Sequence, residues 1–241
     1  LHRRLSVIDH QGGGQPMVSY VEDSPEKAMV FNGCIYNNHE LRNELHALGN
    51  TFESDHSDTE TLFKAYQQWG VDCTDHLDGM YAVAIWDRKT VQLSLLRDSY
   101  GQKPLYVLHL GEAGDGCVFC SNPAPLQTIA GELGLSNLST SGLQRFLQLG
   151  YLTSSDTLIE PVKCVAQSTP LVQPTSETIE GAIRGSVLDH LEADVPLGCF
   201  LSGGVDSSLI AAFAQQELGN LQTYCVKMDD PAYDESSYAL E

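Results

Sequence analysis

Apolar residues recur at two different periods along the first 160 residues of the chain. Residues 37–50 place three leucines on one helical stripe, the last of them Leu48, and residues 57–70 carry a second such stripe. Short apolar runs at hairpin-scale spacing predict strands over residues 28–36, 79–87, 91–98, 104–110 and 116–121. With a further helix over 140–152, residues 1–160 are expected to form an α+β layered domain, in which the last four strands make one antiparallel meander.

The pattern changes near residue 161. Residues 161–177 carry three prolines and little periodicity, so they are expected to be a linker. From about residue 178 an amphipathic helix leads to a buried-type strand over 195–201, a glycine-rich loop that opens another helix, and a strand over 222–228. Strand, loop, helix and strand in this order predict one βαβ unit of a parallel sheet, hence an α/β region.

Composition narrows the classes of function. The 241 residues are 42% hydrophobic, which is enough for a sizeable core. Thirteen basic residues against 32 acidic ones give a net charge of −19, which disfavours binding to nucleic acid and to anionic membranes. No apolar run reaches the roughly 18 residues that cross a bilayer, and the first residues show no signal-peptide pattern. We therefore expect a cytoplasmic protein.

The seven cysteines are an odd number and are scattered along the chain. This usage predicts reduced thiols rather than a disulfide framework. Cys117 and Cys120 form one C-x-x-C pair inside a predicted strand, where they face opposite sides, and no second pair completes a zinc site.

The segment CFLSGGVDSS, residues 199–208, is the strongest local signal of chemistry. Two glycines after a strand turn backbone amides toward a ligand, serine hydroxyls add donors, and the next helix begins with its positive dipole end. These features form a cradle for phosphate or pyrophosphate, and Asp206 fits it if Mg²⁺ lies between them. The alternative is a glycine-rich turn in which Asp206 or Ser207 only caps a helix.

Three further positions each have two interpretations. Asn32 and Gly33 are the commonest tight-turn pair, or they form an oxyanion hole from a side-chain amide and a backbone N–H. Asp58 lies in a capping-box pattern, or it binds a substrate ammonium. Arg4 is solvated, or it holds a carboxylate with two hydrogen bonds.

Seven motifs follow one another along the chain: HRRLSVID, GGGQPM, FNGCIYNN, SDTE, LDGMYAVAIWD, RDSYGQKPLY and DVPLGCFLSGGVDSS. In this order they resemble the glutamine-hydrolysing asparagine synthetases over nearly the whole chain. The resemblance implies an incomplete N-terminal-nucleophile αββα sandwich over 1–160, which is the class II glutamine amidotransferase domain. It also implies a short linker over 161–177 and, over 178–241, the first βαβ unit of an adenine-nucleotide-binding parallel-sheet domain.

The resemblance also implies an activity. Ammonia released from glutamine would travel through a tunnel to aspartate that ATP has adenylated, and asparagine would form through a β-aspartyl-AMP intermediate. Glutamine and aspartate would be the small-molecule partners, ATP and Mg²⁺ the cofactors, and a homodimer is expected by analogy with the family.

The family's site residues can be carried over position by position. The glutamine site would comprise Arg4, Leu5, Ser6, Val7, Ile8, Asn32, Gly33, Cys34 and Asp58. In it, Asn32 and Gly33 would form the oxyanion hole, Arg4 would hold the carboxylate and Asp58 the amino group. The ATP site would comprise Leu201, Ser202, Gly203, Gly204, Val205, Asp206, Ser207, Ser208 and Val226, with Asp206 near Mg²⁺.

Several departures from the family change the expectations. The family's nucleophile is a cysteine at the mature N-terminus, so a chain that begins at Leu1 is expected to lack glutaminase activity and to be truncated. Cys34 stands where the family has a glutamate that helps hold the substrate ammonium, and Asn122 replaces another glutamate. The linker is short for the family, and the chain ends before the later acidic motif that acts on aspartate and pyrophosphate.

Two other functions stay open. Related enzymes adenylate other carboxylates, and their acceptor pockets would lie mostly beyond Glu241. A degenerate, non-catalytic binding protein would explain Cys34 and the short linker.

Overall fold

The computed structural model describes residues 7–9, 11–111, 116–153, 156–168, 178–232 and 234–240. These residues divide into two compact units. The first contains the described residues from 11 to 168, and the second contains those from 178 onward together with 7–9.

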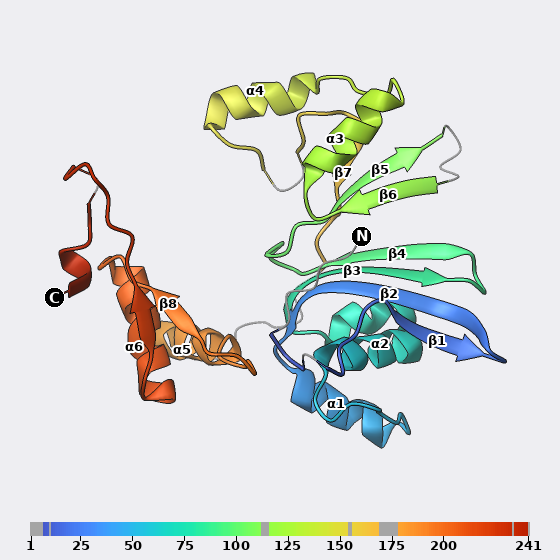
Figure 1. Cartoon of the computed structure of the whole chain (residues 1–241), viewed down its shortest axis with the longest axis horizontal. Helices are drawn as coiled ribbons and strands as arrows, with labels where there is room; N and C mark the ends of the chain where they lie inside the picture. The colour runs from blue at the N-terminus through green and yellow to red at the C-terminus, as the bar shows by residue number, and fades with distance from the viewer. Residues whose placement is uncertain are drawn as a thin grey trace. The chain divides into compact units, whose positions relative to one another are not determined.

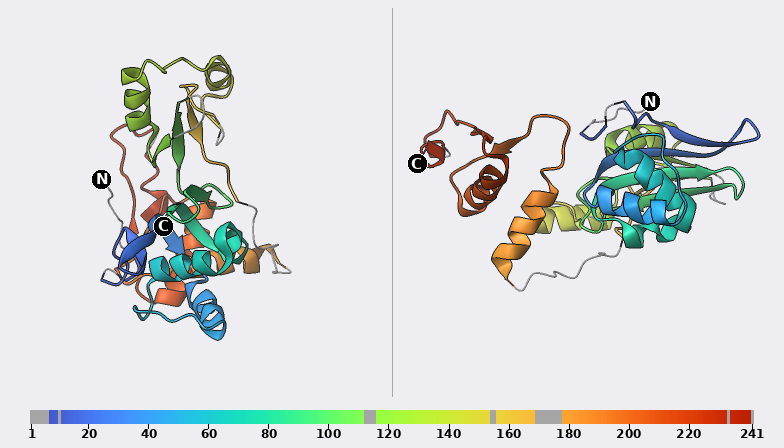
Figure 2. Two further views of the ribbon diagram at one scale, coloured as in Figure 1. Left: turned by 90° about the vertical axis from the view of Figure 1, so that its right-hand side faces the viewer. Right: turned by 90° about the horizontal axis from the view of Figure 1, so that it is seen from below.

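The first unit begins with a four-stranded antiparallel sheet in the order β1–β2–β3–β4. Its strands are β1 (Met17–Val21), β2 (Ser24–Ile35), β3 (Gly79–Asp87) and β4 (Gln92–Arg97). Helices α1 (Asn38–Ala47) and α2 (Asp58–Trp69) cover one face of this sheet, as Figures 1 and 2 show, and the short helix η1 (Gly70–His76) follows α2.

The core of this unit lies between the sheet and the two helices. Alternate residues of β2 and β3 point to one face, which buries Phe31, Val83 and Ile85, and the predicted helical stripes meet them from the other side. Leu41 and Leu45 are buried there, but Leu48 is 52% exposed because α1 ends at Ala47. The predicted stripe was therefore one residue too long.

A second sheet in the same unit has the order β6–β5–β7. Its strands are β5 (Tyr106–Leu110), β6 (Gly116–Cys120) and β7 (Val162–Cys164). Helix α3 (Pro123–Glu132) packs on this sheet through Leu126 and Ala130, and α4 (Thr140–Leu149) follows it. Figure 1 shows the resulting layers of helix, sheet, sheet and helix, so the expected incomplete αββα sandwich is confirmed.

Two expectations about the strands are wrong. The last four strands do not form one meander, because β4 and β5 belong to different sheets and the segment between them is folded around Asp98. Asn32 and Gly33 do not form a turn, since β2 continues through both to Ile35. The tight-turn interpretation fails because residues 27–35 of β2, which include both, are paired with β3 in an extended ladder.

The sequence pattern also missed three elements, namely β1, β7 and α3. The short strand β7 lies inside the range that we expected to be a linker, and Val162 on it is 1% exposed. A strand of three residues is too short to show a period of its own. Residues 169–177 of that range lie outside the described residues.

The second unit contains the predicted βαβ arrangement. Its elements are α5 (Ile179–Asp189), β8 (Gly198–Phe200), α6 (Val205–Leu218), β9 (Gln222–Tyr224) and the short helix η2 (Tyr238–Leu240). Strands β8 and β9 are parallel neighbours, which confirms the α/β prediction. A small core of Val187, Phe213 and Ala214 joins α5 to α6.

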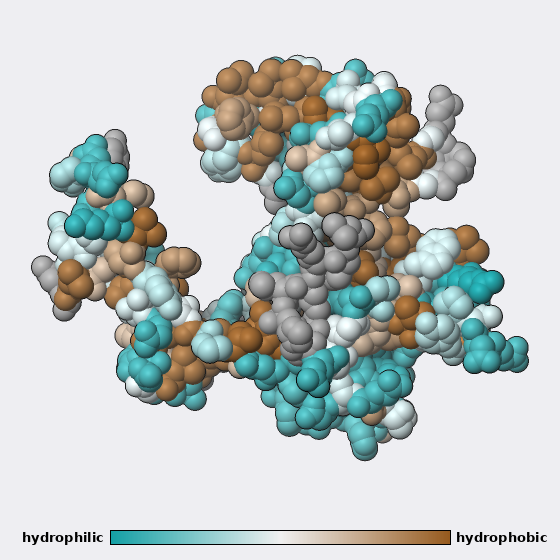
Figure 3. Space-filling model, viewed as in Figure 1, coloured by the Kyte–Doolittle hydropathy of each residue, from teal (hydrophilic) through white to brown (hydrophobic). Residues whose placement is uncertain are grey.

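Some apolar side chains remain at the surface. On the face shown in Figure 3 hydrophobic residues gather over α4, where Phe146, Leu147 and Leu149 are exposed. Among the described residues, no helix has the length and apolar character that crossing a membrane requires.

Candidate active site

Asn32 and Gly33 lie near the end of β2, opposite Ala82 and Tyr81 of β3. A Cβ added to Gly33 would lie 2.0 Å from the Met80 carbonyl oxygen, so no larger residue fits without moving the backbone. The side chain of Asn32 points to the sheet face that α1 and α2 do not cover. Its neighbour Phe31 points into the core on the helix side, and adjacent residues of a strand face opposite sides. The sequence therefore places a side-chain amide beside a glycine at a closely packed point of the sheet.

Asp58 is the first residue of α2 and is only 3% exposed. One of its carboxylate oxygens accepts a hydrogen bond from the Ile35 N–H at 3.3 Å, which brings α2 to the end of β2. Ser57 is the N-cap, and its hydroxyl accepts a hydrogen bond from the Glu60 N–H at 3.4 Å. The predicted cap is thus present, and it does not exclude a binding role because Asp58 itself is not the capping residue.

Glu60 orders the loop before α2. Its carboxylate accepts hydrogen bonds from the backbone N–H groups of Glu53 at 2.7 Å and Ser54 at 2.8 Å. Glu60 is 6% exposed, so these charge-assisted bonds satisfy a carboxylate that has left water. The Glu60 side chain bonds to the loop and not back to the Ser57 N–H. Of the two hydrogen bonds of a capping box, only the one from the Glu60 N–H to the Ser57 hydroxyl is therefore present.

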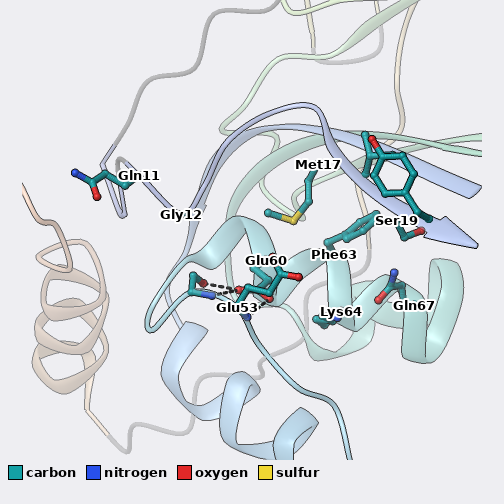
Figure 4. Close-up of a pocket in the computed structure, with 12 residues that line it drawn as sticks. Gln11, Gly12, Met17, Ser19, Glu53, Glu60, Phe63, Lys64 and Gln67 are labelled. Carbon is teal, nitrogen blue, oxygen red and sulfur yellow. Dashed lines mark hydrogen bonds between the residues drawn. The ribbon is translucent and has the colours of Figure 1, made fainter. Parts of the chain in front are cut away.

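A cavity of about 610 Å³ opens between β1 and α2 (Figure 4). It is lined by Gln11, Gly12, Met17, Val18, Ser19, Tyr20, Glu53, Ser54, Glu60, Phe63, Lys64 and Gln67. Figure 4 shows the hydrogen bonds of Glu60 at its edge. None of Asn32, Gly33 and Asp58 lines it, so the cavity and the candidate active site are different places.

The remaining residues of the expected glutamine site fall in three groups. Cys34 lies two residues after Asn32 on β2 and is 3% exposed. Val7 and Ile8 belong to the second unit, where the Val7 carbonyl oxygen accepts a hydrogen bond from the Asp194 N–H at 2.9 Å. Arg4, Leu5 and Ser6 lie outside the described residues. The structure thus brings together Asn32, Gly33, Cys34 and Asp58 of the expected set.

Arg97 and Asp98 form a polar cluster next to β3, the strand that carries Tyr81. The buried carboxylate of Asp98 accepts hydrogen bonds from four backbone N–H groups, which belong to Tyr81, Tyr100, Gln102 and Lys103. Its neighbour Arg97 donates to the Cys164 thiol at 2.9 Å and so connects the two sheets. This segment, RDSYGQKPLY, is one of the family motifs, but the sequence did not predict a role for it. The available signal was a pair of adjacent opposite charges at the end of an apolar strand.

Two buried groups near β3 have strongly shifted pKa values. Burial raises the pKa of the Cys73 thiol to about 12, and the nearby charges of Asp72 and Asp75 act in the same direction. Burial also raises the pKa of Tyr81 to about 12, although the Ser168 hydroxyl hydrogen-bonded to it at 2.9 Å acts in the opposite direction. Both groups are therefore protonated at neutral pH, and the Cys73 thiol is not an activated nucleophile.

The glycine-rich loop of the second unit lies between β8 and α6. Gly204 is the N-cap of α6 and makes no side-chain cap, and Asp206 is exposed within the first turn. The alternative in which Asp206 or Ser207 caps the helix is therefore wrong. Gly203 has φ of +80°, and a Cβ there would lie 2.4 Å from the Cβ of Tyr238, so glycine is required by both conformation and space.

Hydroxyl groups hold this loop from within. The Ser207 hydroxyl accepts from the Ser202 N–H at 3.2 Å and lies 3.1 Å from the Ser202 hydroxyl, which in turn accepts from the Gly204 N–H at 3.4 Å. Leu201 is tied to the next strand, because its N–H donates to the Tyr224 carbonyl oxygen at 2.8 Å. Val226 follows β9 by two residues and is 63% exposed.

These residues fit a phosphate group. The loop offers backbone N–H groups and serine hydroxyls as donors to a ligand. Helix α6, which has 14 residues, begins there without a side-chain cap. The one acidic side chain in the first turn, Asp206, fits only with a cation between it and the phosphate.

The seven cysteines, including Cys117 and Cys120 on β6, are all free thiols.

Models of two protein families match the chain, one after the other. A family model described as a glutamine amidotransferase domain matches residues 1–180, and one described as asparagine synthase matches residues 178–241. The chain therefore belongs to the glutamine amidotransferase domain family.

Among curated relatives, the chain is 32% identical to a glutamine-hydrolysing asparagine synthetase 1 of Bacillus subtilis, over 99% of this chain and 40% of that protein. It is 31% identical to a putative glutamine-hydrolysing asparagine synthetase of Mycobacterium bovis, over 98% of this chain and 40% of that protein. The chain thus spans about 40% of the length of these relatives. A solved glutamine phosphoribosylpyrophosphate amidotransferase from Bacillus subtilis gives a TM-score of 0.40 at 18% identity, over 89% of this chain and 49% of that chain.

Proposed function

We propose that this chain forms part of an ATP-dependent enzyme that converts aspartate to asparagine with ammonia from glutamine, through a β-aspartyl-AMP intermediate. The two family models support the pairing of an amidotransferase with a synthetase, and the names of the curated relatives support aspartate as the acceptor. We propose the domain limits 1–160 and 178–241, with a connection over 161–177 that also contributes strand β7 to the sheet of the first domain.

In the proposed glutaminase reaction, Asn32 and Gly33 stabilise negative charge. In the whole enzyme the attacking group would be the N-terminal cysteine of the family, which is not among the residues of this chain. Its sulfur would bond to the side-chain amide carbon of glutamine, the carbonyl oxygen would gain charge, and two N–H donors aimed at that oxygen would lower the barrier before ammonia leaves. The Asp58 carboxylate binds the substrate ammonium by charge and hydrogen bonding. By the family resemblance, Arg4 would bind the substrate carboxylate.

The single observation that carries this proposal is the attachment of Asp58 to the end of β2, three residues after Asn32 and two after Gly33. An ammonium-binding carboxylate and an oxyanion hole must lie within the length of one amino acid, and this attachment holds the start of α2 against the end of the strand that carries Asn32 and Gly33. The test is a calorimetric titration of the protein with L-glutamine and, as a matched ligand, L-glutamate. Heat of binding for glutamine is expected; no binding of glutamine would refute the proposal.

In the second unit, Ser202 to Ser208 would hold the phosphates of ATP, Asp206 would bind Mg²⁺, and Leu201 and Val226 would contact the adenosine part. When bound, ATP would supply the adenylyl group that activates aspartate. The residues of this chain contribute donors for the phosphates and a carboxylate for the metal.

This part is tested by titrating the protein with Mg-ATP and repeating the titration on Asp206→Ala. Binding is expected to be lost in that variant and kept in Glu217→Ala, which changes an exposed acid near the other end of α6. Equal affinity of Asp206→Ala and wild type would refute the assignment of Asp206 to Mg²⁺.

One observation favours a second candidate, a non-catalytic glutamine-binding or regulatory protein. Cys34, where the family has a carboxylate, is a buried thiol. Binding of glutamine without release of ammonia by the whole protein would favour this candidate, because an oxyanion hole stabilises charge only during catalysis.

We also propose that the protein works in the cytoplasm and, by analogy with the family, as a homodimer. The seven free thiols support a reducing compartment. Light scattering of the purified protein tests the dimer.

A further inference from the structure

The loop of residues 53–57 is the last part of the connection between α1 and α2, and Asp58 follows it as the first residue of α2. Helix α1 presents two donors to this loop from positions one turn apart, Asn38 and Arg42. The Asn38 amide donates to the His56 carbonyl oxygen at 2.9 Å, and the Arg42 guanidinium donates to the Ser54 carbonyl oxygen. One face of α1 therefore holds the loop by its backbone.

The other side of the same loop is held by α2. Glu60 accepts from the backbone N–H groups of Glu53 and Ser54, as described above. Side chains of α1 thus donate to carbonyl groups of the loop, and Glu60 of α2 accepts from its N–H groups. Both helices therefore fix the course of the loop. Since Asp58 follows it directly, the position of the Asp58 carboxylate depends on these bonds.

Asn38 is an unusual residue for its place. It is 2% exposed at the start of a helix, and within the described part of the chain its amide oxygen has no hydrogen-bond partner. A buried polar atom without a partner costs free energy, and an apolar side chain of similar size would avoid that cost. The bond from the Asn38 amide to the His56 carbonyl oxygen is the one gain that the side chain shows in return.

This bond closes a ring of contacts around the proposed site. Strand β2 carries Asn32 and Gly33, α1 begins three residues after β2 ends, Asn38 holds the loop, and the loop ends at Asp58. Asp58 then returns to β2 through the Ile35 N–H. A shift of the loop would move the carboxylate away from the strand that carries the oxyanion donors.

We propose that Asn38 is a positioning residue, which fixes Asp58 relative to Asn32 and Gly33 and thereby sets the affinity for the ammonium group of glutamine. This rests on the proposed glutamine site. Asn38 acts only through the loop and does not touch the substrate.

The test measures two quantities in wild type, in Asn38→Ala and in the matched control Asn43→Ala, an exposed asparagine on the same helix. The first is the dissociation constant of L-glutamine by calorimetry, and the second is hydrogen exchange of the Ile35 amide. For Asn38→Ala we expect affinity about 5- to 10-fold weaker and faster exchange at Ile35, because one hydrogen bond that orders the loop is lost. The control should match wild type in both.

A second variant guards against misfolding of Asn38→Ala. Arg42→Met keeps an unbranched side chain over the Phe52 ring, which lies 3.9 Å from the guanidinium carbon, and removes the donors to the loop. It is expected to change both quantities in the same direction.

The outcomes separate the two proposals. Unchanged glutamine affinity and unchanged Ile35 exchange in Asn38→Ala and in Arg42→Met would overturn the positioning role while leaving the glutamine site intact. Absence of glutamine binding in wild type would overturn the proposed function itself.

Discussion

The proposed glutamine site and the nucleotide loop are held by hydrogen bonds of different range. In the first unit Asp58 bonds to a residue 23 positions away, and Asn37 bonds through its side chain to His76 and Asp78, 39 and 41 positions away. In the second unit the bonds of Ser202 with Gly204 and Ser207 span two to five positions. The side chains of the first site bond to distant residues, whereas the serine side chains of the second bond within their own loop and only the Leu201 backbone bonds to a distant residue, Tyr224.

Burial differs in the same way. Among the described residues, fourteen buried apolar side chains form the core next to the first site, and three form the core of the second unit. A site fixed by buried long-range contacts is preorganised before a ligand arrives, while a locally held, exposed loop leaves more of the ordering to ligand binding. The glutamine site should therefore respond more strongly to distant substitutions than the nucleotide loop does.

The largest effect on this comparison is expected from Asp98→Ala. Removing this buried carboxylate leaves four backbone donors without their acceptor, one of them the buried Tyr81 N–H, so the free energy of unfolding of the first unit should fall by about 3–5 kcal/mol. Both tryptophans of the chain, Trp69 and Trp86, lie in this unit, so tryptophan fluorescence during urea unfolding measures it selectively.

The exposed Asp229→Ala in the second unit serves as the control and should leave the fluorescence transition unchanged. Amide exchange along α6 should also be unchanged in Asp98→Ala. Equal acceleration of exchange in α6 would contradict the separation of the two units.

A smaller effect is expected from alkaline pH through Cys73. The folded protein keeps the thiol proton up to a pKa of about 12, while the unfolded chain releases it near the ordinary value of 9.0. Since the folded pKa is raised, stability is fully present below pH 9.0 and is lost as pH rises toward 12. Between pH 9 and 10.5 the first unit should lose up to about 2 kcal/mol from this thiol.

The measurement is urea unfolding by tryptophan fluorescence at pH 7, 9 and 10.5. Cys73→Ala should be less stable at pH 7, because it leaves a small cavity, and should show a shallower loss above pH 9. An equally steep loss in the variant would mean that Tyr81, whose pKa is also raised to about 12, causes the alkaline destabilisation alone.

The smallest effect is expected from Gly185→Ala in α5. A Cβ there would have nothing within 4 Å, and glycine inside a helix is less favourable than alanine, so the second unit should gain about 0.5–1 kcal/mol. Slower amide exchange in α5 and α6, with the fluorescence transition of the first unit unchanged, is the expected result. Gly33→Ala provides the contrast in the first unit, because its Cβ would meet the Met80 carbonyl oxygen at 2.0 Å.

Most helices and strands were predictable from periodicity because they carry at least one full hydrophobic stripe, whereas α3 was missed. Helix α2 and strand β3 have the predicted limits to within one residue. The pairing of strands was not predictable in the same way: β4 and β5 are consecutive in sequence, yet Asp98 and its four donors separate them into two sheets. A buried carboxylate that organises a loop leaves no periodic signal.

The same contrast applies to the sites. The loop at Gly203 was recognisable from its residues because its structure is local. For Asn32 and Gly33 the residues alone left a turn and an oxyanion hole open, and only the pairing of β2 with β3 excludes the turn. The role of Asn38 depends on a carbonyl group 18 residues away, which the sequence pattern does not indicate.

The most direct test of the account is the affinity for L-glutamine in wild type, Asp58→Asn and Asp55→Asn. Asp58 is buried and attached to β2, whereas Asp55 is an exposed aspartate three residues earlier in the same loop. Asp58→Asn removes the charge that binds the substrate ammonium, so its affinity for L-glutamine should be roughly 30-fold weaker or more. Asp55→Asn should bind L-glutamine as wild type does. Equal affinity of Asp58→Asn and wild type would contradict the assignment of this site to glutamine.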